Sequence, residues 1–288
     1  MAAAKRICIT GAGGMLGGEL LRLTPPAHTH GLTRADLDVA DPAKVESVLS
    51  EIRPDIVINA AAYTKVDDCE TNRDWAEAVN TQRPRHLAQP CAAINARLIH
   101  VSTDYVFNGQ CDRPWQPDDP IDPINVYGQT KAAGESAIRD ILTNHVIVRA
   151  SWVFSDLGQN FVKTMLKLAS ERDELTVVTD QVGSPTYAYD LAEALLALID
   201  TDVTGTLHFA NAGQCSWFEF AQEIMRRAGK STTVTPTDSS AFPRPAARPT
   251  WSVLDTQDYV RVTARPPRPW QDALAQCLRI ILQKPSAL

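Results

Sequence analysis

Tyr127 and Lys131 are the pair of residues whose types and spacing could do chemistry. If residues 128–138 form a helix, side chains four positions apart share one face, with Cβ atoms about 5–6 Å apart. A phenol has an ordinary pKa of about 10, and a neighbouring ammonium favours the phenolate and moves that pKa towards neutrality. The pattern therefore predicts proton transfer by Tyr127, although Tyr-x-x-x-Lys also occurs at ordinary helix starts.

A glycine-rich turn near the N-terminus predicts a dinucleotide site. A short apolar run, residues 5–10, precedes Gly11, Gly14 and Gly17, and a helical pattern follows. In such a turn the first glycine permits the tight bend, the second lets backbone approach a pyrophosphate, and the third lets helix and strand pack closely. The helix N-terminus offers free N–H groups to the phosphates. A turn without a ligand is the alternative reading.

The end of the second expected strand, residues 28–33, bears on the choice of cofactor. NAD sites usually carry an acid there, whereas an arginine accommodates a 2′-phosphate. The sequence continues with Arg34 and has no acid before Asp36. It therefore favours NADPH slightly over NADH, unless Arg34 is an ordinary solvated charge.

The third and fourth expected strands, residues 56–62 and 97–103, end in residues that could line a ligand site. Open α/β sheets bind ligands at the carboxyl ends of their strands. Small side chains there leave room for a ligand, and a hydroxyl could hydrogen-bond a substrate carbonyl. These residues are Ala60, Ala61, Ala62, Ser102 and Thr103. Tight turns and capping hydroxyls are the alternatives.

Three other polar or aromatic positions each have a functional and a structural interpretation. His100 alternates with apolar residues, so we expect a core histidine rather than a catalyst. Trp152 follows the fifth expected strand, 145–151, and could line a pocket or belong to the core. In the Pro-rich loop 236–249, Arg248 could meet an anionic ligand or be solvated.

The composition is that of a soluble globular protein and argues against several classes. Hydrophobic residues make up 44% and charged residues 22%, which is ordinary. The net charge of -6 argues against a nucleic-acid binder, and no apolar run reaches the length of a membrane span. The N-terminal stretch does not read as a secretory signal. Six scattered cysteines without C-x-x-C predict reduced thiols, no metal site and a cytoplasmic location.

Strand and helix patterns alternate up to residue 150, which predicts an α/β fold with a doubly wound parallel sheet over residues 1–150. The pattern over residues 151–288 is less regular and predicts a smaller C-terminal α/β part that binds substrate. The loop 108–125 lies between a strand and the helix that carries Tyr127. Loops of this length inside a domain are usually functional or disordered.

Seven stretches resemble, in order, the dTDP-4-dehydrorhamnose reductases of the extended short-chain dehydrogenase/reductase superfamily. They cover roughly residues 5–258 and read TGAGGMLG, NAAAYTKVDDCE, STDYVFNG, INVYGQTKAAGE, RASWVF, GSPT and ARPTWSVLD. NAAAYTKVD and STDYVFNG are specific to this branch. The resemblance implies a Rossmann-like fold whose two parts interleave along the chain. It also implies an oxidoreductase in which NADPH or NADH reduces the 4-keto group of dTDP-4-dehydro-L-rhamnose.

The resemblance also implies residue roles. Thr103 would orient the ketone and Tyr127 would protonate the developing alkoxide, while Lys131 would hold the nicotinamide ribose and depress the pKa of Tyr127. Further cofactor contacts would come from Gly14, Met15, Leu16, Asp38, Val39, Ala60, Ala61 and Ala62. Further substrate contacts would come from Val66, Asp67, Asp104, Trp152 and Arg248.

One departure from the family pattern bears on assembly. Some relatives form a magnesium-bridged dimer through glutamates near the glycine turn and after the GxPT stretch. Here those places hold Met15 and residues 187–190, Tyr-Ala-Tyr-Asp. We therefore expect a monomer or homodimer without that metal, with Glu19 and Asp190 as weak alternative carboxylates.

Two other functions remain open from the sequence. One is a reductase or epimerase that acts on another nucleotide sugar. The other is a binding protein like the non-catalytic regulatory subunit of methionine adenosyltransferase, which shares this fold.

Overall fold

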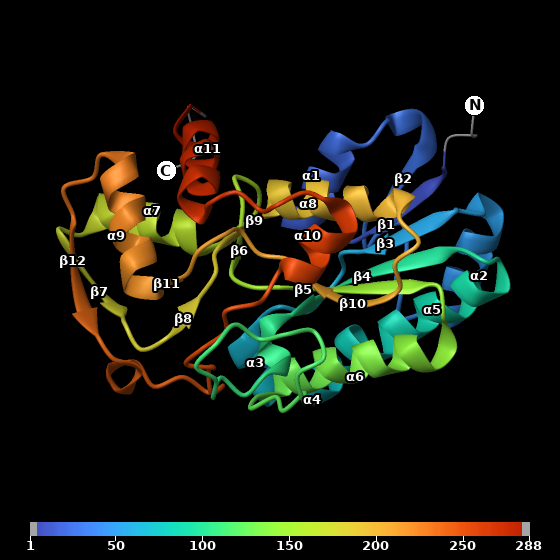
Figure 1. The fold of residues 1–288 in the computed structure, drawn as a ribbon, viewed down its shortest axis with the longest axis horizontal. Coiled ribbons are helices and arrows are strands. Elements are labelled where there is room, and N and C mark those ends of the chain that lie inside the picture. The colour runs from blue at the N-terminus through green and yellow to red at the C-terminus, as the bar shows by residue number, and fades with distance from the viewer. Residues whose placement is uncertain (1–4, 284–288) are drawn as a thin grey trace.

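A six-stranded parallel sheet forms the centre of the protein, in a computed structural model that describes residues 5–283 (Figure 1). Its strands lie in the order β10-β5-β4-β3-β1-β2, and every neighbouring pair is parallel. The bounds are Ile7–Thr10 (β1), Thr29–Leu32 (β2), Ile56–Asn59 (β3), Arg97–Thr103 (β4), His145–Ala150 (β5) and Gly205–His208 (β10). The chain leaves β1 in one direction and continues from β3 in the other. The crevice at the carboxyl ends of β1 and β3 is therefore the switch point where such sheets bind ligands.

Helices cover both faces of this sheet, as a parallel sheet with apolar strands requires. One face carries α1 (Met15–Leu23) and α8 (Ala188–Ala197), and the other carries α2 (Pro42–Ile52), α5 (Arg83–Ala93) and α6 (Val126–Ile141) (Figure 1). Successive residues of a strand point to opposite faces. In β3, accordingly, Ile58 packs with Leu20 and Leu195 on the first face, while Val57 packs with Leu49 on the second. The predicted doubly wound α/β sheet is confirmed.

A smaller part lies to the left of the central sheet in Figure 1. It contains α7 (Phe161–Glu171), α9 (Trp217–Ala228), α11 (Trp270–Gln283) and the parallel pair β7 (Glu174–Val178) and β12 (Thr233–Thr237). Its separate core includes Phe154, Phe220 and Leu274. Two short strand pairs complete it: β6 (Val153–Phe154) with β9 (Thr186–Tyr187), and β8 (Val182–Gly183) with β11 (Cys215–Ser216).

The chain crosses between the two parts more than once. Helix α8 and strand β10 follow residue 150 in the sequence, yet α8 covers the central sheet and β10 forms one of its edges. The domain limits drawn near residue 150 stay a prediction, and their outermost residues, 1–4 and 284–288, lie outside the described part. No helix among residues 5–283 is long and apolar enough to cross a bilayer.

The remaining helices and helical turns are short. They are α3 (Val66–Thr71), α4 (Arg73–Glu77) and α10 (Gln257–Thr263), with a π-helical turn over Ala78–Gln82 and 3₁₀ turns over Pro26–His28, Asp104–Val106, Leu198–Asp200 and Ser239–Ala241. Local capping explains two helix starts. Asp41 caps α2 by accepting from the backbone N–H of Lys44 at 3.1 Å, and Asn125 caps α6 by accepting from that of Gly128 at 2.8 Å. Helix α6 therefore begins two residues earlier than the sequence pattern predicts.

A buried ion pair anchors α6 to the sheet. Glu135 of α6 accepts from Arg149 of β5, with Nη2 at 2.8 Å and Nε at 3.0 Å, and from the Ser102 hydroxyl of β4 at 2.5 Å. Burial alone would raise the pKa of Glu135, but the hydrogen bond and charge of Arg149 lower it overall. Arg149 also donates to the Pro117 carbonyl at 3.0 Å. The pair thus holds the helix with the Tyr-x-x-x-Lys motif, two strands and the preceding loop together.

Glu135→Ala should destabilise the protein by about 3–5 kcal/mol, because it leaves the Arg149 guanidinium buried and unpaired. The folded-state pKa of Glu135 is lowered. The stability that Glu135 contributes is therefore present above its pKa in the unfolded chain. It is lost as the pH falls through its pKa in the folded protein. Denaturant unfolding, followed from neutral pH downwards, measures both effects. Glu46→Ala, at an exposed position of α2, is the control and should lower the free energy of unfolding only slightly. An equally small loss for Glu135→Ala would contradict the role given to the ion pair.

Candidate active site

Two neighbouring cavities open at the carboxyl ends of the central strands. The first, of about 320 Å³, lies over the glycine turn and the end of β2. The second, of about 410 Å³, lies between the end of β4, the start of α6 and the smaller part. Gly14, Ala60 and Ala62 line both. The cavities are therefore adjacent segments of one cleft that follows the switch point of the sheet.

The glycine turn has the backbone geometry that its sequence predicts. Gly11 has a φ of +74°, and a Cβ there would come within 2.7 Å of the backbone nitrogen of Ala61. A Cβ at Gly17 would lie 2.2 Å from the carbonyl oxygen of Gly11. Helix α1 begins after Gly14 without a side-chain cap or an acid in its first turn. Its free N–H groups and tight backbone therefore fit a cofactor pyrophosphate.

Nearly all residues predicted to bind the cofactor lie on the cavity walls. The first cavity is lined by Gly11, Gly14, Arg34, Asp38, Val39, Ala60, Ala61 and Ala62. The second is lined by Met15, Leu16, Tyr127 and Lys131. Gly17 lies behind the wall, where it serves the close packing of α1. The individual binding roles stay predictions.

The three predicted catalytic residues converge on the second cavity. Thr103 ends β4, and its hydroxyl lies 3.0 Å from a carboxylate oxygen of Asp104. Tyr127 and Lys131 lie one turn apart on α6 and share the same wall. The ammonium of Lys131 donates to the Val101 carbonyl at 2.7 Å. Strand β4 and helix α6 therefore bring the hydroxyl, phenol and ammonium to one place.

The protonation of Tyr127 differs from the sequence-based expectation. Burial raises the pKa of its phenol, and a hydrogen bond with Thr103 offsets only part of this. Burial also lowers the pKa of Lys131 to about 8. The predicted depression of the Tyr127 pKa by Lys131 is therefore not found, because desolvation raises that pKa by more than the Thr103 hydrogen bond lowers it. The phenol carries its proton at neutral pH, as an acid that protonates an alkoxide must.

His100 is the buried core residue that its alternation predicts. Asn59 Oδ1 accepts from the backbone N–H of Ala61 at 3.1 Å, so the amide Nδ2 faces His100 Nδ1 at 2.9 Å. That nitrogen must accept, which leaves the hydrogen on Nε2, 3.4 Å from Lys131 Nζ. Burial and then the charge of Lys131 lower the pKa of His100 well below its usual range. His100 is therefore neutral, and in this tautomer its Nε2 accepts no hydrogen bond from Lys131.

Three of the predicted substrate residues line the second cavity in addition to Thr103: Val66, Asp104 and Trp152. Trp152 stacks on Trp217 with ring centroids 3.6 Å apart and an interplanar angle of 8°. It therefore contributes both to the wall and to the core of the smaller part. Asp104 is buried, and burial raises its pKa to about 7.

Asp67 and Arg248, also predicted to contact substrate, line neither cavity. Arg248 donates to both carboxylate oxygens of Asp67, at 2.8 and 2.9 Å, and Arg244 lies 3.5 Å from the same carboxylate. The arginines of the loop 236–249 thus meet an anion of the chain itself. The pair joins α3 to this loop.

Several lining residues were missed by the sequence analysis. They are Tyr63, Trp75 and Arg83 in the first cavity and Tyr105, Asn160 and Trp217 in the second. Tyr63 and Tyr105 lie inside two of the stretches that carry the family resemblance. No motif marks the other four, which reach the cleft from helices or loops that the fold places there. A weak signal existed for Tyr63, which follows the three alanines directly.

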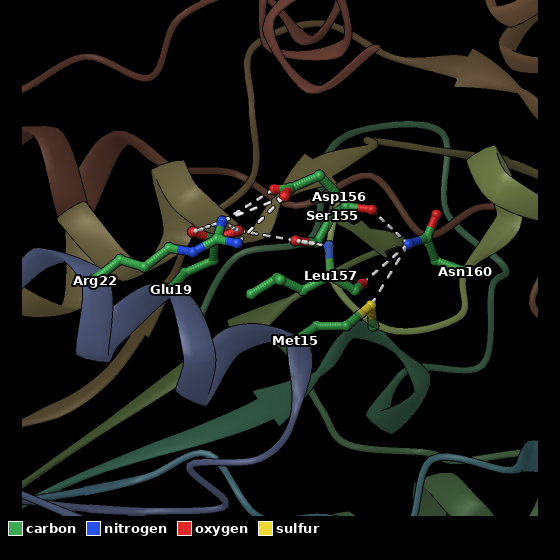
Figure 2. Close-up of polar contacts among 7 residues, drawn as sticks. All are labelled: Met15, Glu19, Arg22, Ser155, Asp156, Leu157 and Asn160. Carbon is green, nitrogen blue, oxygen red and sulfur yellow. Dashed lines mark hydrogen bonds and ion pairs between the residues drawn. The ribbon is translucent and has the colours of Figure 1, made fainter. Parts of the chain in front are cut away.

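A cluster of polar side chains attaches the glycine-turn helix to the substrate side of the cleft (Figure 2). Glu19 of α1 is fully buried and accepts from the Ser155 hydroxyl at 2.9 Å. Arg22 lies 3.2 Å from carboxylate oxygens of both Glu19 and Asp156. Burial raises the pKa of Glu19, against the opposing effects of Ser155 and Arg22. Two carboxylates from different parts of the protein therefore share one guanidinium.

The same cluster holds part of the cavity wall. Asn160 donates to the Ser155 carbonyl at 2.6 Å, and its amide nitrogen lies 3.7 Å from Met15 Sδ (Figure 2). Asn160 and Met15 both line the second cavity. The segment before α7 thus packs against the start of α1. The cluster therefore sets the distance between the two sides of the cleft.

A doubly wound sheet, a glycine turn at its switch point and a Tyr-x-x-x-Lys helix beside it define a nicotinamide-dependent reductase of the extended short-chain type. Comparisons with known proteins agree. Residues 5–282 match the family described as RmlD substrate binding domain. The dTDP-4-dehydrorhamnose reductase of Mycobacterium tuberculosis is 44% identical over 286 residues, covering 95% of this chain and 92% of the relative.

Two further relatives are informative. The crystal structure of the Bacillus anthracis dTDP-4-dehydrorhamnose reductase, in complex with NADP, is 39% identical with a TM-score of 0.93, covering 96% of this chain and 99% of that one. A probable dTDP-4,6-dihydroxy-2-methyloxan-3-one 4-ketoreductase of Streptomyces antibioticus is 39% identical and covers 96% of each chain. The chain belongs to the dTDP-4-dehydrorhamnose reductase family and is an NAD(P)H-dependent oxidoreductase.

Glu19→Gln should remove the additional stability that the wild type has at acidic pH. The folded-state pKa of Glu19 is raised, so its contribution is fully present below the unfolded pKa and lost as the pH rises through the folded value. The free energy of unfolding of the wild type should therefore increase relative to Glu19→Gln as the pH falls from neutrality. Denaturant unfolding at several pH values measures this difference. Glu51→Gln, exposed at the end of α2, should show no such trend, and a flat difference for Glu19→Gln would refute the assignment.

Proposed function

We propose that this chain reduces the 4-keto group of dTDP-4-dehydro-L-rhamnose to give dTDP-L-rhamnose. The observation that carries this proposal is the convergence of Thr103, Tyr127 and Lys131 on one cavity wall beside the glycine turn. Membership of the dTDP-4-dehydrorhamnose reductase family supports the substrate.

The chain's own residues position the ketone and move the proton. The nicotinamide cofactor, held at the glycine turn and by Lys131, supplies a hydride to the carbonyl carbon. The Thr103 hydroxyl hydrogen-bonds the ketone oxygen and fixes its orientation. Tyr127 gives its phenolic proton to that oxygen as it gains negative charge, so the product is the neutral alcohol. The Lys131 ammonium then stabilises the phenolate, which regains its proton from solvent.

The walls of the second cavity suit a deoxyhexose. Val66 and the stacked pair Trp152 and Trp217 offer an apolar surface to a sugar ring and its methyl group. A few polar groups then fix orientation, as is usual in small-ligand sites. Thr103 and Asp104 are the polar groups at the end of β4.

A reductase of another dTDP-linked 4-keto sugar is the second candidate. The Streptomyces antibioticus 4-ketoreductase, as similar to this chain as the Bacillus anthracis enzyme, favours it. The same catalytic set serves either substrate, because it acts only on the carbonyl group. A panel of dTDP-4-keto sugars separates the two candidates by their kcat/KM values.

The assembly and location are also proposals. We propose a monomer or homodimer without a bridging metal, because Glu19 is held by Arg22 and Asp190 is paired with Arg268 at 2.6 Å. A cytoplasmic location is supported by the cysteines, since Cys8, Cys69, Cys91, Cys111 and Cys215 are free thiols.

Tyr127→Phe should lower kcat by about 10²–10⁴-fold, because it removes the general acid, while cofactor binding stays intact. NADPH absorbance with the dTDP-4-keto sugar gives the rate, and calorimetry with NADP⁺ gives the affinity. Tyr259→Phe is the matched control, since this tyrosine packs against Phe209 on the α8 side of the sheet. A rate for Tyr127→Phe within tenfold of wild type would exclude the proposed acid.

The reaction should also slow in alkaline solution. Because burial lowers the pKa of Lys131 to about 8, its ammonium is lost above that pH and the phenolate is no longer stabilised. We expect kcat/KM to be level near neutrality and to decline above about pH 8. A profile that stays level up to the ordinary lysine range, about pH 10, would show that Lys131 is not the titrating group.

A further inference from the structure

We propose that His100 is a positioning residue for Lys131. Its ring is fixed so that the Nε2–H group faces the lysine nitrogen, turns the hydrogens of the lysine towards the second cavity and favours its neutral form. The inference rests on the proposed function in one respect, that Lys131 belongs to the catalytic set. It goes further, because it gives a role in that set to a buried histidine that lines neither cavity.

The orientation of the His100 ring depends on the amide of Asn59, which two donors hold. The Thr10 hydroxyl donates to Asn59 Oδ1 at 2.8 Å, and the backbone N–H of Ala61 donates to the same oxygen at 3.1 Å. The amide nitrogen of Asn59 is therefore the atom that lies 2.9 Å from His100 Nδ1. An amide nitrogen only donates, so Nδ1 accepts and the ring hydrogen lies on Nε2.

The register of the central sheet places these side chains in one row. Thr10 of β1 pairs with Asn59 of β3, and Asn59 pairs with His100 of β4. Directly paired residues of neighbouring strands point to the same face, which here is the face that α6 covers. Thr10, Asn59, His100 and Lys131 are each at most 2% exposed. Bulk water is therefore excluded from the row, and its hydrogen bonds fix the ring.

The lysine nitrogen meets one acceptor and one donor on β4. Lys131 Nζ donates to the Val101 carbonyl at 2.7 Å and lies 3.4 Å from His100 Nε2. An ammonium has three hydrogens and no acceptor, so it cannot accept from Nε2–H, whereas the neutral amine can. The histidine thus opposes the charged form in addition to burial, which lowers the pKa of Lys131 to about 8. The hydrogens that Val101 does not use are left to point into the cavity.

The other titratable groups around the pair do not supply this effect. They are Tyr127, Glu135 and Arg139 on α6, His145 on β5 and Asp104 beyond β4. The charge of Glu135 acts in the opposite direction, because it favours the ammonium. Burial, and then the charges of Lys131, Arg139 and His145, hold the pKa of His100 well below its usual range. The ring is therefore neutral at and above neutral pH, and its Nε2–H donor persists there.

NMR of the cofactor-free protein tests the assignment without turnover. Nitrogen spectra of the imidazole groups distinguish the two tautomers, and the signals of His100 are identified by their loss in His100→Gln. We expect the hydrogen on Nε2 and no titration from neutral pH upwards. Carbon spectra of the lysine side chains give the pKa of Lys131, whose signal is identified by its loss in Lys131→Met.

Three variants separate the donor from the general packing of the sheet. His100→Leu removes the donor, so the pKa of Lys131 should rise by about half to one pH unit, the size of one net hydrogen bond. His100→Gln should keep that pKa near the wild-type value, because its carboxamide can accept from Asn59 and donate towards Lys131. His145→Leu removes another buried histidine, whose Nδ1 faces the Leu142 carbonyl on the neighbouring strand, and should leave the pKa of Lys131 unchanged.

Either of two results would overturn the inference: a hydrogen on Nδ1 of His100 in the wild type, or a pKa of Lys131 that does not rise in His100→Leu. The first needs only His100→Gln, so the test holds if His100→Leu fails to fold. A protein in which the pKa of Lys131 responds, but which does not reduce the dTDP-4-keto sugar, keeps the inference and rejects the proposed reaction. A protein that reduces the sugar, with the same Lys131 pKa and the same alkaline decline of kcat/KM in wild type and His100→Leu, does the reverse.

Discussion

The backbone of the glycine turn lies directly against the segment that follows β3, with no room for a side chain between them. Gly11 has no room for a Cβ because the backbone of Ala61 lies against it, and Gly17 has none because it packs on the turn itself. This contact brings the start of α1 to the switch point of the sheet. The two cavities therefore meet at the same backbone, at Gly14 and the alanines that follow β3.

Burial determines the protonation of Tyr127 and Lys131. The phenol of Tyr127 and the ammonium of Lys131 lie in a wall from which water is largely excluded, so desolvation favours the neutral form of each. A protonated phenol is ready to act as an acid, and a nearby lysine can stabilise the phenolate once the proton has left. The contacts of Glu135 with Arg149 of β5 and Ser102 of β4 hold α6 against both strands. A structural ion pair and the proposed catalytic pair thus share one helix.

The two sides of the cleft are held by polar contacts rather than by a continuous core. Apolar clusters fill the faces of the sheet and the smaller part separately. Between them, Arg22 links Glu19 to Asp156 (Figure 2), and Arg248 links Asp67 to the loop 236–249. The arginines of these ion pairs are partly exposed, at 43% for Arg22 and 19% for Arg248, so the two sides of the cleft are joined close to solvent.

The sheet, the glycine turn and the Tyr-x-x-x-Lys pair could be predicted from the sequence, because each depends on neighbours close in the chain. Apolar runs ending in Gly11 or Thr103 are such local signals. What surrounds these features depends on segments far apart in the chain, which only the folded protein brings together. It turned the expected depression of the Tyr127 pKa into a rise, because burial depends on distant segments, and it paired Asp67 with Arg248 outside the cavities. It also brought Trp75 and Arg83 beside Arg34, a wall that has no counterpart in any continuous stretch of the chain.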